Sequence, residues 1–186
     1  LVLANTTNAS LNASSGVDYT PALEYWNGTA WVSYTAGTFV QAPSDGDTTA
    51  GEPTNLLVRV AIANDTVSDN NETFNLVATN TGGTSVAGVG TIKDDGTGSV
   101  FLATNTTSTP DAVSPATLDD DRPLTVSSVT VNEGSPYAVF TVSGTTGELT
   151  KLSLSSGTAT VGTDSGTALQ YYDPTANSGA GAWVDY

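Results

Sequence analysis

The passage GVDYTPALEYW at residues 16–26 recurs without gaps as GTDSGTALQYY at residues 162–172. Both copies then close alike, with AWVSY at residues 30–34 and AWVDY at residues 182–186, after a loop that is six residues longer in the second copy. A repeat with a period of roughly 150 residues is typical of tandem arrays, whose modules are usually structural or binding units. The chain therefore holds more than one module and less than two.

The pattern of apolar residues predicts strands throughout the chain. Apolar residues recur at a spacing of two and are rich in Val, Thr, Tyr and Phe, while Gly, Asn, Asp, Ser and Thr clusters separate the runs. The predicted strands are residues 22–26, 31–34, 37–41, 56–62, 73–79, 86–92, 125–131, 138–143 and 149–155. We therefore expect an all-β fold built of β-sandwich modules.

The repeat also predicts how the modules divide. Residues 1–97 correspond to the later three quarters of one module, residues 98–123 form a connector rich in Thr, Ser, Asp and Pro, and residues 124–186 are the first half of the next module. The chain is thus out of register with the module boundaries. Neither part closes a sandwich by itself, and a half sandwich exposes an apolar face and unpaired strand edges.

Composition excludes several classes of function. Four basic residues stand against 19 acidic ones, a net charge of −15, which argues against binding nucleic acid or an anionic membrane surface. Crowded carboxylates instead favour divalent cations as partners. The absence of Cys and His removes disulfides, thiolate metal sites and the commonest general base. No apolar run reaches the roughly 20 residues that insertion into a bilayer requires.

Acidic residues gather where predicted strands end. The four clusters are Glu133, then Asp18 with its repeat Asp164, then the run at residues 64–72, and lastly the consecutive aspartates Asp94 and Asp95 together with Asp119, Asp120 and Asp121. Loop carboxylates at one end of a sandwich can converge to supply the six to eight oxygens that calcium prefers. Asp and Asn also form turns, so one acidic loop would be weak support for a calcium site. Four acidic loops at the ends of strands are stronger support for such a site.

Five motifs together resemble the Calx-beta family of β-sandwich modules, which occur in sodium-calcium exchangers and in giant bacterial surface proteins. They lie at residues 129–134 with the strand at 138–143, at 16–19, at 62–65, at 69–74, and at 90–95. The resemblance implies an immunoglobulin-like fold that binds Ca²⁺ at one end. It implies as ligands Glu133, Asp18 or Asp164, Asp65, the carbonyl of Val67, Asp69, Glu72, Asp94 and Asp95, with Asp119, Asp120 and Asp121 at the junction between modules.

These observations lead to one main hypothesis and three alternatives. The main one is a non-catalytic, calcium-binding repeat that extends and stiffens the stalk of a large extracellular bacterial adhesin or surface fibre, with neighbouring repeats as partners. The second is a subunit of an extracellular filament, joined end to end with identical subunits by strand complementation. The third is a carbohydrate-binding module that uses aromatic residues such as Trp26, Trp31 and Trp183 to bind glycans. An enzyme is the least favoured, because no nucleophile or oxyanion donor accompanies the acidic pairs.

Overall fold

The computed structural model describes residues 1–7, 11–41, 55–69 and 71–186. Its two compact units are Leu1–Glu148 and Leu149–Tyr186. The described residues form an all-β chain, as predicted, and none of their helices is long and apolar enough to cross a membrane. The elements in chain order are β1 (Val2–Asn5), β2 (Tyr19–Trp26), β3 (Trp31–Ser33), β4 (Val58–Ile62), β5 (Glu72–Thr79), β6 (Ser85–Ile92), the 3-10 turn η2 (Pro115–Thr117), β7 (Thr125–Val126), β8 (Val142–Ser143), β9 (Gln170–Asp173), the helix-like turn α1 (Ala176–Gly179) and β10 (Ala182–Asp185).

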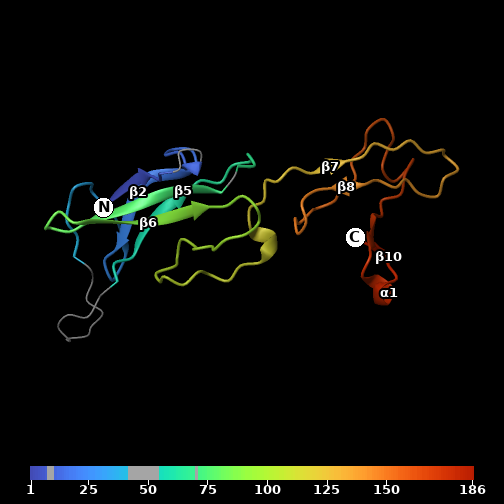
Figure 1. Cartoon of the computed structure of the whole chain (residues 1–186). Helices are drawn as coiled ribbons and strands as arrows, with labels where there is room; N and C mark the ends of the chain where they lie inside the picture. Colours follow the sequence, from blue (N-terminus) through green and yellow to red (C-terminus); the bar gives the residue numbers. More distant parts are fainter. Residues whose placement is uncertain (8–10, 42–54, 70) are drawn as a thin grey trace. The chain divides into compact units, whose positions relative to one another are not determined.

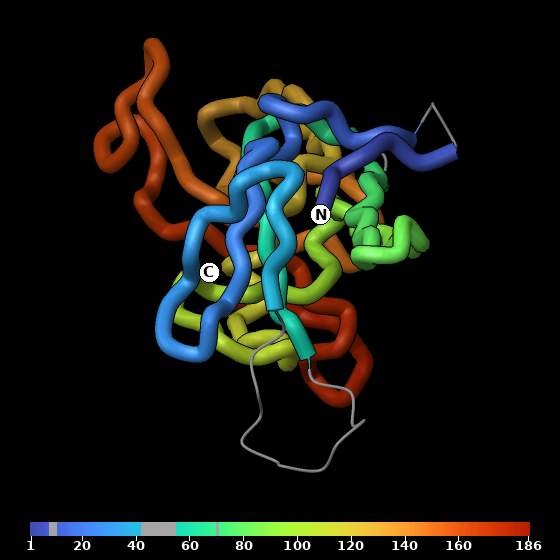
Figure 2. The backbone as a smooth tube through the Cα atoms, turned by 90° about the vertical axis from the view of Figure 1, so that its left-hand side faces the viewer, coloured from blue at the N-terminus to red at the C-terminus, as the bar shows by residue number. Residues whose placement is uncertain are grey.

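Two three-stranded antiparallel sheets form the framework of the first unit. One sheet has the order β1-β5-β6 and the other has the order β3-β2-β4. β5 and β6 pair from Glu72 opposite Ile92 to Thr79 opposite Ser85, and they lie side by side in Figure 1. Figure 2 shows the backbone of β2 and β3, in blue, next to the start of β4, in teal. The strands predicted within residues 1–97 are confirmed, except the one at residues 37–41, which is not a strand.

The two sheets share a small core. The rings of Tyr19 on β2 and Phe74 on β5 lie 5.0 Å apart and are both buried. Gly90 on β6 faces the Phe74 ring, and a Cβ there would lie 2.5 Å from the ring's Cζ, so glycine makes room for the aromatic side chain. The remaining apolar members of this core are Leu3, Ala13, Val60 and Ile92. The sheets therefore pack against each other, although few side chains are fully buried.

The predicted connector at residues 98–123 folds back within the first unit. Its two ends meet where the Gly96 N–H donates to the Asp119 carbonyl at 2.8 Å. Midway along, the Asn105 carbonyl accepts a hydrogen bond from the Trp31 indole Nε1 at 3.0 Å. The bond from Trp31 attaches the connector to the β3-β2-β4 sheet, and the bond from Gly96 ties it to the segment that follows β6.

The predicted strands at residues 125–131 and 138–143 are much shorter than expected. β7 and β8 form a two-residue antiparallel pair, which one further bond, from the Ser127 N–H to the Thr141 carbonyl at 2.9 Å, extends. No third strand joins this pair among the described residues. An isolated hairpin is only marginally stable in water, which accounts for the shortening. The predicted strand at residues 149–155 is absent for the same reason, because it has no pairing partner.

The second unit reproduces the local structure of the repeated passage. Gly16 and Gly162 take the left-handed conformation, with φ of 86° and 89°. In β2 and β3 Trp26 lies opposite Trp31, and in β9 and β10 Tyr172 lies opposite Trp183, with edge-to-face rings 5.6 and 5.7 Å apart. The repeat in the sequence is thus a repeat of turn geometry and strand register.

Candidate metal centre

Acidic side chains from separate segments of the first unit converge at one end of the two sheets. Asp18 ends the turn before β2, Asp65 and Asp69 lie between β4 and β5, Glu72 opens β5, and Asp94 follows β6. Antiparallel pairing places these segments together, because β4 and β6 end where β2 and β5 begin. The sequence prediction that these five residues belong to one site is therefore supported by where the strands place them.

Three of these carboxylates can reach a common ion. One oxygen from each of Asp18, Asp69 and Glu72 lies within 4.8 Å of the others. Oxygens that share one calcium ion at about 2.3 to 2.6 Å stand up to roughly 5 Å apart, so this cluster could hold a metal ion. A cavity of about 20 Å³ lies among them, enough for one ion or one water. Its lining residues are Asp18, Ala63, Asp65, Asp69, Glu72, Ile92 and Asp94.

Backbone hydrogen bonds hold the cluster in place. Asp18 is 8% exposed, and its Oδ2 accepts a hydrogen bond from the Ser14 N–H. The Asp18 carbonyl accepts the Ala63 N–H at 2.9 Å, which ties this turn to the segment after β4. The Asp69 N–H donates to Asp94 Oδ2 at 3.0 Å. Loops from both sheets are thereby fixed around the same cavity.

The crowding of negative charge shifts the protonation of the site. Burial, a hydrogen bond with Asp18 and the charges of Asp18, Asp69 and Asp94 raise the pKa of Glu72 to about 7. Burial also raises the pKa of Asp94, with help from the charges of Asp69, Asp119 and Asp65 and against the hydrogen bond from the Asp69 N–H. A divalent cation would offset this repulsion and favour the charged carboxylates.

The connector adds further acidic groups near this end. The Asp121 N–H donates to the Asp94 carbonyl at 3.2 Å. Partial burial raises the pKa of Asp121, and the charges of Asp119, Asp94 and Asp65 raise it further. Asp121 Oδ2 is shielded from solvent and has no hydrogen-bond partner among the described residues. Two of the predicted junction aspartates therefore lie within electrostatic reach of the centre.

Two other predicted ligands are bound to basic side chains. Asp95 contacts Lys93 at 3.4 Å, and Asp120 contacts Arg122 at 2.6 Å. A hydrogen bond from Thr97, and then the charge of Lys93, lowers the pKa of Asp95. Hydrogen bonding to Arg122 lowers the pKa of Asp120. Lys93 and Arg122 thus pair with Asp95 and Asp120 rather than with Asp18, Asp69 or Glu72.

Three other predicted ligands, Val67, Glu133 and Asp164, are not among the residues that line the cavity. The Val67 N–H donates to Asp65 Oδ1 at 2.7 Å, within the loop that lines the cavity. Asp164 Oδ2 accepts the Thr160 N–H at 2.8 Å, as Asp18 does from Ser14 in the first copy. Over the described part of the chain, neither Glu133 nor Asp164 joins a group of three potential metal ligands.

Sequence reasoning missed two residues that shape the cavity. Ala63 and Ile92 line it beside the carboxylates. They lie within the motifs at residues 62–65 and 90–95, but neither carries a side-chain oxygen, so neither was predicted as a site residue. Their positions after β4 and at the end of β6 follow only from the pairing of the strands.

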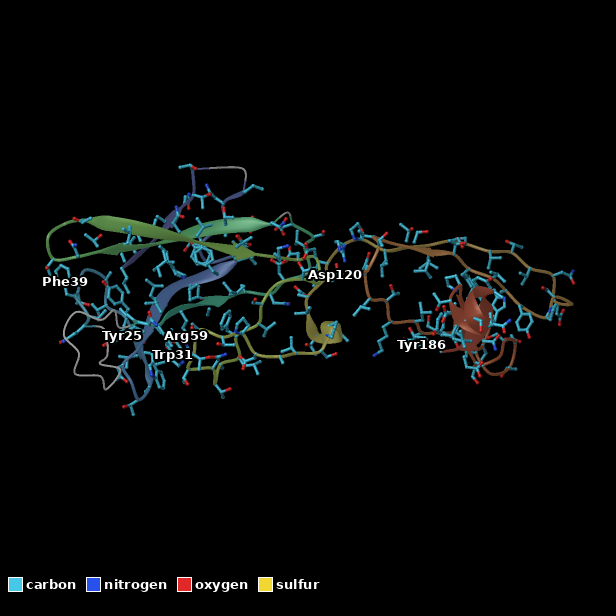
Figure 3. The ribbon with its side chains drawn as sticks, turned by 60° about the horizontal axis from the view of Figure 1, so that its bottom comes forward. Tyr25, Trp31, Phe39, Arg59, Asp120 and Tyr186 are labelled. Atoms are coloured by element: carbon cyan, nitrogen blue, oxygen red, sulfur yellow. The ribbon has the colours of Figure 1, made fainter. Side chains whose placement is uncertain are left out.

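The aromatic residues proposed as a glycan platform do not line the cavity, and they are divided between the first unit, with Trp26 and Trp31, and the second, with Trp183. Figure 3 shows Tyr25, Trp31 and Arg59 gathered on the same side of the strands. The guanidinium of Arg59 lies 4.3 Å from the centre of the Trp31 ring. One face of that ring is therefore covered by an intramolecular cation–π contact.

Comparison of the chain with protein-family models, with curated proteins and with solved structures found no match.

Proposed function

We propose that the chain is a non-catalytic, calcium-binding structural module of a large extracellular bacterial adhesin or surface fibre, in which it extends and stiffens the stalk. The observation that carries this proposal is the convergence of Asp18, Asp69 and Glu72 around one small cavity. These residues come from segments that only the folded sheets bring together. An ion bound there would link the turn before β2 to the loop before β5.

Calcium is the ion that fits these ligands best. The cluster offers carboxylate oxygens, and the chain contains no Cys or His that would favour zinc or another transition metal. Calcium tolerates irregular geometry and several carboxylates, whereas magnesium requires a near-ideal octahedron and gives up its water reluctantly. The elevated pKa of Glu72, about 7, reflects repulsion that a divalent cation would relieve.

A structural role is supported by the repeat and by the incomplete core. The repeated passages share turn geometry and strand register, as expected of modules in an array. The two packed sheets accord with the immunoglobulin-like, Calx-beta-like architecture that the motifs resemble. The extracellular bacterial setting rests on that resemblance and on a strongly acidic chain without cysteine. In such a module, bound calcium would stiffen the fold, as disulfides do in other extracellular proteins.

The proposal predicts that calcium raises the melting temperature of the first unit. At a calcium concentration of 100 times the dissociation constant, binding adds about 2.7 kcal/mol, which raises the melting temperature by roughly 10 °C. Thermal unfolding followed by tryptophan fluorescence, in excess calcium and in chelator, measures the difference. An unchanged melting temperature would rule the proposal out.

A matched pair of variants tests where calcium binds to stabilise the chain. Asp18→Asn should remove most of the calcium-dependent stabilisation, because Asp18 contributes to the three-carboxylate cluster. Asp164→Asn makes the same change at the equivalent turn of the second copy, where Asp164 also accepts a backbone hydrogen bond. The Asp164 variant should respond to calcium as the unaltered chain does. Equal losses in both variants would place the binding elsewhere.

A further inference from the structure

An open groove of about 320 Å³ lies between the two sheets of the first unit. Leu23 on β2, with Val58 and Val60 on β4, lines one side, and Leu76 on β5 and Gly88 on β6 line the other. A Cβ on Gly88 would meet nothing within 4 Å. β4 and β6 are each the outer strand of their sheet among the described residues. The groove is therefore a largely apolar floor, with Arg59 also in its lining, between two strand edges that could accept further strands.

The hairpin at residues 124–143 complements this groove, because it has an apolar face that is exposed to solvent. Val126 lies opposite Val142, and Phe140 is on the same face because it is two residues from Val142. Their exposed fractions are 64%, 40% and 51%. Over the described residues, the hydrogen bonds that we find for residues 124–148 all stay within that segment, such as the one from Ser127 to Thr141.

The internal repeat indicates which segment belongs in the groove. In the second module a hairpin at residues 125–143 precedes the repeated passage at 162–186. In the first module the equivalent passage, residues 16–34, forms β2 and β3 beside the groove. The order of segments in the second module therefore points to a hairpin of this kind as the segment that fits beside β2 and β3.

The charges of the two surfaces are also compatible. The chain carries a net charge of −15, so two copies repel each other over most of their surface. Within residues 124–143, Glu133 is the only charged residue, and it lies in the turn between the strands. The apolar faces of the hairpin and of the groove therefore bring no like charges together, and Glu133 in the turn is the one carboxylate that the hairpin adds near the acceptor.

The expected orientation follows from the antiparallel sheets. If residues 138–143 add to β4 in antiparallel sense, they run away from the acidic end, because β4 runs toward it from Val58 to Ile62. Residues 124–131 then run toward the acidic end and begin at the opposite one. The turn that contains Glu133 reaches the acidic end of the acceptor and adds a carboxylate there.

In that orientation, with residues 138–143 next to β4, the chain's own hairpin cannot reach the groove. Asp121 is bonded to the Asp94 carbonyl at the acidic end, and Figure 3 shows Asp120 at the other end of the strands from Tyr25 and Trp31. The three residues from Asp121 to Leu124 span at most about 10 Å. The strand from residue 124 to residue 131 would cover roughly 25 Å, so Leu124 would have to start that far away.

We infer that the groove of the first unit binds the 124–143 hairpin of a second copy of this chain. The hairpin adds a strand to the edge of β4 and buries Val126, Phe140 and Val142 against the groove. Because each copy offers one groove and one hairpin on different surfaces, the association is head-to-tail and need not close. The apolar contact itself uses no calcium, but the hairpin brings Glu133 to the acidic end of the acceptor, where calcium would relieve the repulsion.

Sedimentation velocity of the full chain, in excess calcium and in chelator and over a range of concentrations, tests this association. We expect the chain to form dimers and longer species as concentration rises. Val126→Asp with Val142→Asp should weaken association at least about 100-fold, because two charges would enter the groove. The control, Thr125→Asp with Ser143→Asp, adds the same charges on the other face and should weaken it far less. A chain that stays monomeric, or two variants that behave alike, would overturn the inference.

Cross-linking distinguishes a second copy from the chain's own hairpin. The chain has no cysteine, so single substitutions report on single positions. A copy with Ala61→Cys on β4, mixed with a copy with Tyr137→Cys at the start of the second hairpin strand, should form a heterodimer with a short bis-maleimide. Tyr171→Cys in place of Tyr137→Cys is the control and should not cross-link. Absence of the heterodimer, or purely intramolecular cross-links when both cysteines are in one chain, would refute the second-copy assignment.

Discussion

Glu72 shows how the fold changes the chemistry of a single side chain. It is the first residue of β5, and it faces Asp18 from the turn before β2. Burial and the neighbouring carboxylates raise its pKa to about 7, from the usual 4.5. The folded chain therefore binds a proton at Glu72 more tightly than the unfolded chain does.

This difference in pKa predicts a pH-dependent stability in the absence of calcium. The stabilising contribution of the protonated Glu72 is fully present below pH 4.5 and is lost as pH rises through about 7. In chelator, the melting temperature of the first unit should therefore fall between pH 5 and pH 8. Glu72→Gln should remove most of this fall, because glutamine does not titrate. Thermal melts at several pH values measure both slopes, and equal slopes would show that Glu72 is not responsible.

The aspartates with lowered pKa act in a different pH range. Hydrogen bonds from Thr97, Arg122 and Thr175 lower the pKa of Asp95, Asp120 and Asp173. Their contributions are present above the unfolded pKa near 3.8 and are lost only in more acidic solution. They therefore do not obscure the effect of Glu72 between pH 5 and pH 8.

At the level of elements, Arg59 joins three segments of the chain. From β4 its Nε donates to Glu24 on β2 at 2.7 Å, and its guanidinium covers Trp31 on β3. Its Nη1 donates to the Ala103 carbonyl of the connector at 2.9 Å. A planar group with several donors can satisfy all three contacts at once.

Replacing Arg59 with lysine should loosen this junction. Lysine keeps the charge but cannot hold Glu24, Trp31 and the Ala103 carbonyl together, so we expect a loss of about 1 kcal/mol in the free energy of unfolding. Urea denaturation measures the loss, and hydrogen exchange should quicken around residues 100–105. Glu24→Gln, which leaves the contacts with Trp31 and Ala103, is the milder control. No change in exchange in the Arg59 variant would show that the connector is held by other contacts.

At the level of the whole molecule, the two copies of the repeated passage differ in their surroundings. In the first unit β2 pairs with both β3 and β4. In the second unit β9 pairs with β10 alone among the described residues. The same local geometry is thus supported by a core in one unit and by a single hairpin in the other.

This difference should appear in hydrogen exchange at low protein concentration. Amides of β9 and β10 should exchange rapidly, because a two-stranded hairpin opens easily. Amides of β4 and β5 should exchange more slowly, and calcium should slow them further, because both strands adjoin the acidic cluster. Calcium should leave β9 and β10 unchanged. Comparable protection of the two units would contradict this picture.

Much of the local structure could be predicted from residues alone. The alternating run at residues 73–79 became β5, and the turn at Gly16 and Asp18 recurs at Gly162 and Asp164. The predicted strands at residues 125–131 and 138–143 kept only the pair β7 and β8. Their alternation is genuine, but a strand also needs a neighbour to bond with, and sequence periodicity does not supply one.

For the candidate site, the sequence predicted which carboxylates could be ligands, but it did not predict which of them lie around the same cavity. Asp18, Asp65, Asp69, Glu72 and Asp94 meet around one cavity because antiparallel pairing brings distant loops to the same end. Asp95 and Asp120, which have the same side chain, instead contact Lys93 and Arg122. Adjacent residues such as Asp94 and Asp95 can therefore contact different partners in the folded chain, because the backbone turns their side chains in different directions.

The sequence by itself determined the all-β character, the repeat, the acidity and the types of ligand available, because these depend on side-chain chemistry and short-range spacing. Only the tertiary structure decided which acids share a cavity, that Glu72 holds its proton to about pH 7, and that a groove remains open beside β4. Those properties depend on contacts between residues far apart in the chain. Their positions in space are set by strand pairing and sheet packing, which no local pattern encodes.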